Sequence, residues 1–216
     1  MDLPVGCRVI VIQEPGVGHI CSMLAIFHLG GVYVPIDFMQ PLSRLRDLLD
    51  DCQPRVILYY MPTAELAEAL SLRNILIVDV SNISSSTSSD IKAIPTLLVH
   101  AGLPAKILYT SGSTGKPKGI ILSHAVLCQH LEGMTRTLSL EKEIILQQSA
   151  PTFDLAISQV LMTFCNGYTL IVVPQSKRGD AMQITQLMVQ TGVTFTFATP
   201  SEYIFWLRHS HNSCIL

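Results

Sequence analysis

The sequence is poor in charged side chains and lacks the long apolar runs of membrane proteins. Only 14% of its 216 residues are Asp, Glu, Lys or Arg, and the formal net charge is −2. Without a basic stripe, the chain has no electrostatic footprint for nucleic acid or for an anionic lipid surface. No uninterrupted apolar run approaches the length of a membrane-spanning helix. These absences predict a protein that binds neither nucleic acid nor membrane.

Metal-binding and disulfide patterns are also missing. The six cysteines are widely scattered without a Cys-x-x-Cys pair, and the seven histidines show no metal-ligand spacing. The N-terminal residues Met1–Pro4 lack the basic segment that opens a secretory signal peptide. We therefore expect reduced cysteines, no metal site and a cytoplasmic location.

Short apolar runs alternate with helical patterns along most of the chain, and the 49% hydrophobic content is enough for one sizeable core. Strands are predicted at residues 9–12, 32–36, 55–60, 74–78, 105–109, 119–122, 143–148, 168–173 and 193–197. Helices are predicted at residues 19–29, 41–51, 63–72, 124–137, 154–164, 182–190 and 200–207. Ser123 is predicted to cap the helix at 124–137, and Gly30-Gly31 and Gly192 are predicted to end the helices at 19–29 and 182–190. This alternation predicts an α/β fold with a parallel, doubly wound sheet. The serine-rich run at 84–89 is interpreted as a flexible surface connection inside that fold.

The strongest chemical signal is the segment Thr110–Gly119, which lies between two apolar runs. It combines glycines, hydroxyl side chains and two lysines. Glycines let the backbone approach a ligand closely, while N–H groups, hydroxyls and lysines bind phosphate oxygens. The segment is neither a Walker A loop, since Pro117 follows Lys116, nor a Gly-x-Gly-x-x-Gly dinucleotide loop. A phosphate-binding loop is therefore favoured over the alternative, a solvated Gly/Ser turn.

This segment resembles the phosphate-binding signature of the adenylate-forming superfamily, which includes acyl- and aryl-CoA ligases, luciferases and adenylation domains of non-ribosomal peptide synthetases. The Ser123-His124 pair that follows makes the peptide-synthetase branch the best match. The resemblance implies the large N-terminal domain of that superfamily as the fold and ATP, with magnesium, as the cofactor. For the two lysines, a role as solvated loop residues is the alternative. The implied ATP contacts are Thr110, Ser111, Gly112, Ser113, Thr114, Gly115, Lys116 and Lys118.

A second candidate site begins at Asp154, the first residue of an apolar helical pattern. On the residues alone, an aspartate there is best interpreted as a helix N-cap. The resemblance implies instead the carboxylate that pairs with the α-ammonium of an amino-acid substrate, an interaction that is strong when desolvated. By the same comparison Leu155, Ser158 and Ala198 line the substrate pocket. The small Ser158 predicts a roomier or more polar pocket.

The resemblance implies a two-step reaction in which ATP activates a carboxylic acid, here an amino acid, and a phosphopantetheinyl carrier protein then accepts the acyl group as a thioester. The family motifs for the magnesium-binding Glu, the ribose-binding Asp and the catalytic Lys do not occur within these residues. Residues 1–216 are therefore interpreted as a partial AMP-binding adenylation domain, without C-terminal subdomain or carrier domain. We assign no catalytic residue and expect it to be inactive or weak alone. A fragment of an acyl- or aryl-CoA ligase and a non-catalytic binding remnant are the alternatives.

Overall fold

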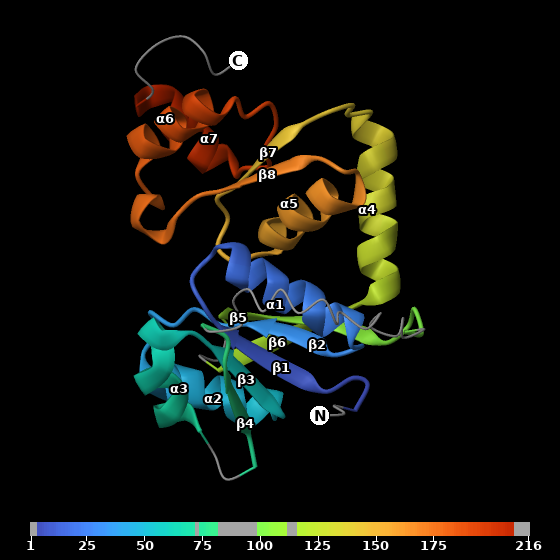
Figure 1. Ribbon diagram of the computed structural model, residues 1–216, viewed down its shortest axis with the longest axis vertical. Helices are drawn as coiled ribbons and strands as arrows, with labels where there is room; N and C mark the ends of the chain where they lie inside the picture. The colour runs from blue at the N-terminus through green and yellow to red at the C-terminus, as the bar shows by residue number, and fades with distance from the viewer. Residues whose placement is uncertain (1–3, 72–73, 82–98, 112–115, 210–216) are drawn as a thin grey trace, which may run out of the picture. The chain divides into compact units, whose positions relative to one another are not determined.

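The computed structural model describes residues 4–71, 74–81, 99–111 and 116–209 of the chain (Figure 1). The chain divides into two compact units, one formed by residues 1–13 and 18–128 and the other by residues 14–17 and 129–216. The serine-rich run at 84–89 lies outside the described residues. Each unit is an α/β structure and is described in turn.

In the first unit, the described strands form one six-stranded sheet in the order β4-β3-β1-β2-β5-β6. All neighbours pair in parallel except β5 and β6, which are antiparallel. The predicted α/β fold with a parallel sheet is therefore confirmed, with β5 and β6 at the edge as the antiparallel exception. The connection from β5 to β6 is far shorter than the dozen or more residues that a parallel crossover needs. The strands are β1 (Arg8–Ile12), β2 (Val32–Pro35), β3 (Val56–Tyr59), β4 (Leu76–Asp79), β5 (Pro104–Ser111) and β6 (Pro117–Ser123).

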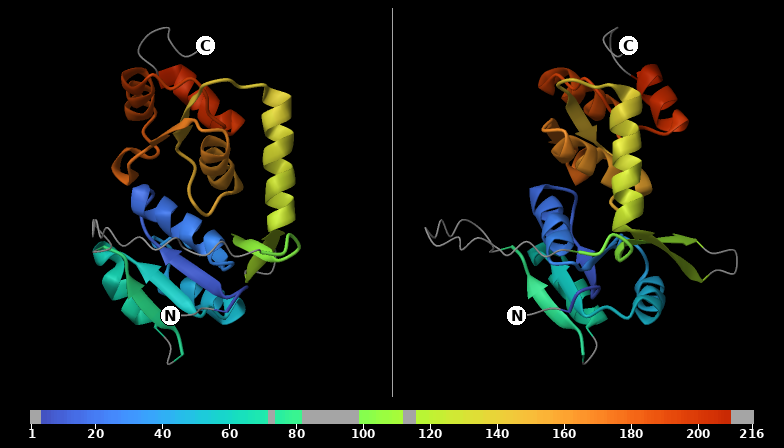
Figure 2. Two further views of the ribbon diagram at one scale, coloured as in Figure 1. Left: turned by 45° about the vertical axis from the view of Figure 1, so that its right-hand side comes forward. Right: turned by 90° about the vertical axis from the view of Figure 1, so that its right-hand side faces the viewer.

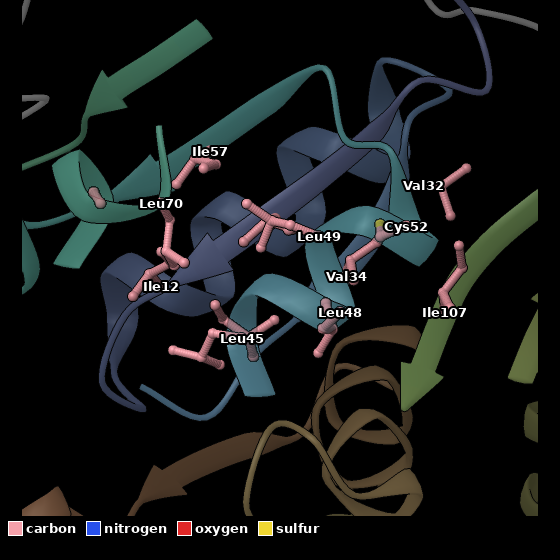
Figure 3. Packing of buried hydrophobic residues seen from close by; sticks show 13 residues of the cluster. Ile12, Val32, Val34, Leu45, Leu48, Leu49, Cys52, Ile57, Leu70 and Ile107 are labelled. Carbon is pink, nitrogen blue, oxygen red and sulfur yellow. The ribbon is translucent and has the colours of Figure 1, made fainter. Parts of the chain in front are cut away.

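Helices cover both faces of this sheet (Figures 1 and 2). On one face, α2 (Leu42–Cys52) and α3 (Ala64–Leu70), which follows a 3-10 turn at Met61–Thr63, bury apolar side chains against the strands (Figure 3). The other face carries α1 (Val17–His28), whose Phe27 packs edge-on against Tyr33 with ring centroids 6.0 Å apart. Neighbouring residues on a strand face opposite sides, so Tyr33 meets α1 while its β2 neighbours meet α2.

The second unit is built around a smaller parallel pair, β7 (Ile144–Gln147) and β8 (Thr169–Val172), which α5 (Asp154–Cys165) connects. A 3-10 turn at Gln175–Lys177 leads to α6 (Ala181–Thr191), and α7 (Pro200–His209) follows. Trp206 of α7 is only 3% exposed because it packs into the cluster formed by β7 and α6. α4 (His124–Leu138) begins in the first unit and ends in this one.

Of two local predictions for these elements, one is confirmed and one is wrong. The predicted N-cap of α4 is confirmed, since the backbone N–H of Val126 donates to Oγ of Ser123 at 3.3 Å. The predicted strand at residues 193–197 is wrong: only an isolated bridge joins Phe195 to Ile145. Backbone bonds run from the N–H of Thr194 to the carbonyl of Ile144 at 2.9 Å and from the N–H of Leu146 to the carbonyl of Phe195 at 3.1 Å. A side chain interrupts this pattern, because the N–H of Ile144 donates to Oγ1 of Thr194 at 2.9 Å. This stretch therefore follows β7 without forming a regular ladder.

Candidate functional site

The predicted phosphate-binding segment spans an antiparallel hairpin. The register runs from Pro104 opposite Ser123 to Ser111 opposite Pro117, so the two strands carry the segment at one end (Figure 2). Thr110 and Lys118 face each other in this register, and Thr110, Lys116 and Lys118 are all exposed. Residues 112–115, which include four of the predicted ATP contacts, lie outside the described residues. The hairpin therefore brings Thr110 and Lys118, which are eight positions apart in the sequence, next to each other at its loop end.

Arg44 adds a third cation beside this end of the hairpin. Its Nη2 donates to the backbone carbonyl of Thr110 at 3.4 Å. Sequence reasoning gave Arg44 no ligand-binding role, although its position two residues into α2 places it on the element that packs beside β6. Arg44 and Lys118 therefore both lie beside Thr110, and Lys116 directly precedes β6, so this end of the hairpin carries cations that suit a ligand of high negative charge.

Beneath the loop, the close contact between β5 and β6 depends on a glycine. A Cβ added to Gly119 would lie 3.2 Å from Cγ2 of Ile107 and 3.3 Å from the ring of Tyr109. That ring is held in place because its hydroxyl donates to Oδ2 of Asp51 at 2.7 Å. Burial, together with this carboxylate, raises the pKa of Tyr109, so the phenol stays protonated. Gly119 thus lets the aromatic ring pack against the hairpin close to its loop end.

We expect Gly119→Val to lower the free energy of unfolding by about 1–3 kcal/mol, because the branched side chain overpacks the space held by Ile107 and Tyr109. Gly133→Ala is the matched control, since a Cβ at Gly133 meets no atom within 4 Å. In the interior of α4 that change should raise stability by up to about 1 kcal/mol. Urea unfolding of both variants measures the difference. Equal stability of Gly119→Val and the wild type would contradict the packing argument.

Asp154 is the first residue of α5 rather than its cap. Phe153 occupies the N-cap position and makes no side-chain capping bond. The exposed Asp154 carboxylate accepts a hydrogen bond from the N–H of Leu155 at 2.9 Å through Oδ1. The N-cap interpretation made from the residues alone is therefore wrong. A negative charge in the first helical turn is favourable toward the helix dipole, and its exposure leaves it open to a cationic partner.

The other predicted pocket residues have different surroundings. Leu155 is half-buried, and Ala198 packs against the cluster that contains Trp206. Ser158 is only 6% exposed, and its Oγ lies 3.0 Å from Nε2 of His130 on α4. The small serine therefore leaves room that the imidazole of His130 occupies.

Phe197, which sequence reasoning did not select, lines a cleft of about 400 Å³ together with α4. Its ring packs edge-on against Phe195 at 4.9 Å between centroids, as the alternation of residues 193–197 would have indicated. Ala198, its neighbour, packs into the cluster around Trp206 instead. The residues that line the cleft are Gln129, His130, Gly133, Met134, Thr137, Leu138 and Phe197.

A hydrogen-bond network fixes the turn that leads to Asp154. The guanidinium of Arg178 donates to the carbonyls of Gln148 and Ser149, to Oε1 of Gln147 at 2.7 Å, and through Nε to the carbonyl of Val173 at 3.1 Å. Burial lowers the pKa of Arg178 to about 10, which leaves it charged at neutral pH. Arg178 therefore binds the ends of both strands to the turn before α5.

Gln159, which is fully buried in α5, links this turn to the stretch that carries Phe197. Its Nε2 donates to Oε1 of Gln148 at 3.0 Å and to the carbonyl of Phe197 at 2.7 Å. Its Oε1 accepts from the N–H of Ser149 at 3.4 Å. The Gln159 side chain thus joins the turn before Asp154 to Phe197 in the wall of the cleft.

The described residues contain no group of three or more His, Cys, Asp or Glu side chains suited to a metal ion. Over the same residues, no helix is both long and apolar enough to cross a bilayer. The first unit carries the cationic end of the β5–β6 hairpin. The second unit carries the exposed carboxylate at the start of α5 and the cleft that α4 and Phe197 line.

An α/β fold with these features is that of the N-terminal domain of adenylate-forming enzymes. The chain is similar to a four-domain nonribosomal peptide synthetase solved with AMP and glycine (TM-score 0.80, 24% identity, 95% of this chain and 15% of that one). It is equally similar in fold to ATP-bound MatB from Rhodopseudomonas palustris (TM-score 0.81, 22% identity, 95% of this chain and 42% of that one). At these identities the likeness establishes the fold.

Sequence comparison establishes the family. The AMP-binding enzyme family matches residues 2–214, and the chain belongs to it. It is 40% identical to the hybrid PKS-NRPS synthetase pydA of an Acremonium species over 214 residues, which cover 99% of this chain. It is 42% identical to the hybrid PKS-NRPS synthetase thnA of Trichoderma harzianum over 212 residues, 96% of this chain. The chain spans 5% of the length of each of these two relatives.

Proposed function

We propose that the chain binds ATP at the β5–β6 hairpin and the ammonium of an amino acid at Asp154, as part of an adenylation domain of the peptide-synthetase type. The observation that carries the amino-acid assignment is the exposed carboxylate of Asp154 at the start of α5, one turn before Ser158. An acyl- or aryl-CoA ligase has no need of a carboxylate there. The hybrid PKS-NRPS relatives support the same assignment.

In the first proposed step, an oxygen of the amino-acid carboxylate attacks the α-phosphorus of ATP. The bond from that phosphorus to the bridging oxygen breaks, and pyrophosphate leaves with the bonding electrons. Lys116, Lys118 and Arg44 would offset the charge on the leaving group, while Asp154 fixes the substrate through its ammonium. Positioning and charge stabilisation of this kind account for most of the catalysis in phosphoryl chemistry.

In the second proposed step, the thiolate of a phosphopantetheinyl carrier attacks the acyl carbon of the adenylate, a thioester forms and AMP leaves. The described residues offer no acidic cluster for magnesium, so none is assigned to it. Nor does the sequence contain the family's ribose-binding and catalytic-Lys motifs. We therefore propose that these 216 residues bind nucleotide and amino acid but are inactive or very weak alone.

Calorimetric titration with ATP tests the nucleotide half of the proposal. The Lys116→Ala/Lys118→Ala double variant should bind ATP about tenfold more weakly than the wild type, because it removes two phosphate-facing charges. Lys142→Ala is the control, since this exposed lysine lies in the second unit. A wild-type chain that does not bind ATP would favour the non-catalytic remnant.

The inactivity of the isolated chain is tested by ATP–pyrophosphate exchange with each proteinogenic amino acid. We expect exchange close to background with every amino acid. Robust exchange with any one of them would contradict the proposed inactivity and would identify the substrate at the same time.

A further inference from the structure

We infer that His130 is a specificity-determining residue for the side chain of the amino-acid substrate. The inference rests on the proposed function in so far as Asp154 binds the substrate ammonium. Nε2 of His130 lies 3.0 Å from Oγ of Ser158. Ser158 is 6% exposed, whereas His130 is exposed and lines the cleft. The polar surface at this point of the pocket is therefore the imidazole and not the serine hydroxyl.

The helix geometry connects this imidazole to the proposed ammonium site. Ser158 lies four residues after Asp154 on α5, so both occupy the same face of the helix, about 6 Å apart along its axis. An amino acid held at Asp154 can therefore direct its side chain along this face toward His130. Helix α5 is bonded to both sides of the cleft, because Ser158 contacts His130 and the neighbouring Gln159 donates to the carbonyl of Phe197 at 2.7 Å.

The cleft selects the size and character of that side chain. Its volume of about 400 Å³ falls in the range of small-molecule sites, and Met134, Leu138 and Phe197 supply apolar walls. Gly133 adds space, since a Cβ there would meet no atom within 4 Å. The volume is large enough for an aromatic ring, and the imidazole of His130 offers a ring nitrogen for one hydrogen bond. The geometry thus favours a bulky aromatic amino acid whose ring carries a hydrogen-bonding group, such as a phenol.

A simpler role for His130, as a bond that only fastens α4 to α5, makes a different prediction. A merely structural histidine would not distinguish a ligand with a hydroxyl from one without it. The two roles are separated by p-cresol and toluene, which present the same ring with and without the hydroxyl and carry neither ammonium nor carboxylate. Binding of these probes does not depend on Asp154, so the outcome is independent of the ammonium site.

The experiment titrates the full chain, with isotope-labelled histidine, against p-cresol and against toluene, and follows the imidazole signals by NMR. We expect p-cresol to shift the His130 signals and to bind about fivefold more tightly than toluene, the gain of one neutral hydrogen bond. In His130→Phe the two probes should bind equally. His28→Phe, which changes an exposed histidine of α1 in the first unit, should leave the fivefold preference intact. A preference that survives in His130→Phe, or binding of neither probe to the wild type, would overturn the inference.

A parallel titration with tyrosine and phenylalanine separates this inference from the proposed function. Asp154→Asn should weaken both amino acids to the same extent and leave p-cresol binding unchanged. If Asp154→Asn affects neither amino acid, the ammonium assignment fails, while the p-cresol preference still decides the role of His130. Ser158→Ala provides the complementary variant: loss of its positioning bond to His130 should reduce, without abolishing, the preference for p-cresol. An unchanged preference in Ser158→Ala would show that the serine does not position the ring.

Discussion

Arg178→Met is expected to lower the free energy of unfolding of the second unit by about 3 kcal/mol. The substitution keeps much of the apolar stem and removes a guanidinium that donates to four backbone carbonyls and to Oε1 of Gln147. Hydrogen bonds from a charged donor contribute more than neutral ones, and the carbonyls left behind lose their partners in a partly buried setting. Chemical unfolding followed by tryptophan fluorescence measures the loss, because Trp206 is the single tryptophan and reports on this unit.

Arg136→Met is the matched control for Arg178. Arg136 pairs with Glu132 one turn earlier on α4 at 3.0 Å, and both side chains are mostly exposed. An exposed pair of this kind contributes roughly 0–0.5 kcal/mol. Equal losses in the two variants would show that the network around Arg178 contributes no more than a surface ion pair.

Asp154→Asn should weaken the binding of an amino acid by roughly 30-fold and leave unchanged the binding of the matching carboxylic acid without the amino group. The amide keeps the size and one acceptor oxygen of the carboxylate but loses its charge, and a charge-assisted bond contributes about 2 kcal/mol. Calorimetry with both ligands measures the effect. The affinity for ATP should not change, because the predicted phosphate contacts lie on other elements.

Glu132→Gln is the control for Asp154→Asn, since it neutralises an exposed carboxylate on α4 that pairs only with Arg136 among the described residues. It should leave amino-acid binding unchanged. Equal affinity of wild type and Asp154→Asn for the amino acid, combined with tight binding of the deaminated acid, would favour the acyl- or aryl-CoA ligase alternative.

Most of the secondary structure followed from the sequence because local signals agreed with one another. The serine at the start of α4 and the glycines after α1 and α6 set helix ends that the structure confirms, with positive φ at Gly30 and Gly192. The antiparallel β5–β6 pairing was missed because alternation of strands and helices does not record strand direction. The short connection between the two strands does indicate antiparallel pairing, because a parallel crossover needs a dozen or more residues.

The candidate site was less predictable, since its decisive contacts join residues far apart in the sequence. Arg44 and Thr110 are 66 positions apart, and His130 and Ser158 are 28 apart. No local pattern reports such a contact. The capping role predicted for Asp154 was wrong for a more local reason. If Asp154 were the N-cap, the helix would begin at Leu155, but it begins one residue earlier, at Asp154 itself. Helix propensities of the residues do not define the first residue of a helix to within one position.

The β5–β6 hairpin also bears on the order in which the chain folds. Its own pairings are local, whereas its attachment to the rest of the sheet joins Tyr33 to Lys106, a separation of 73 residues (106 minus 33). Isolated hairpins form in about 1–10 μs, and closing a long loop adds a further entropic delay. We expect the hairpin to form early as a local element and to dock onto β2 late. Pulse-labelled hydrogen exchange would then show the amides of Ile107 and Ile121 protected before those of β2. The two strands that flank the predicted phosphate-binding segment would therefore pair before the rest of the sheet is complete.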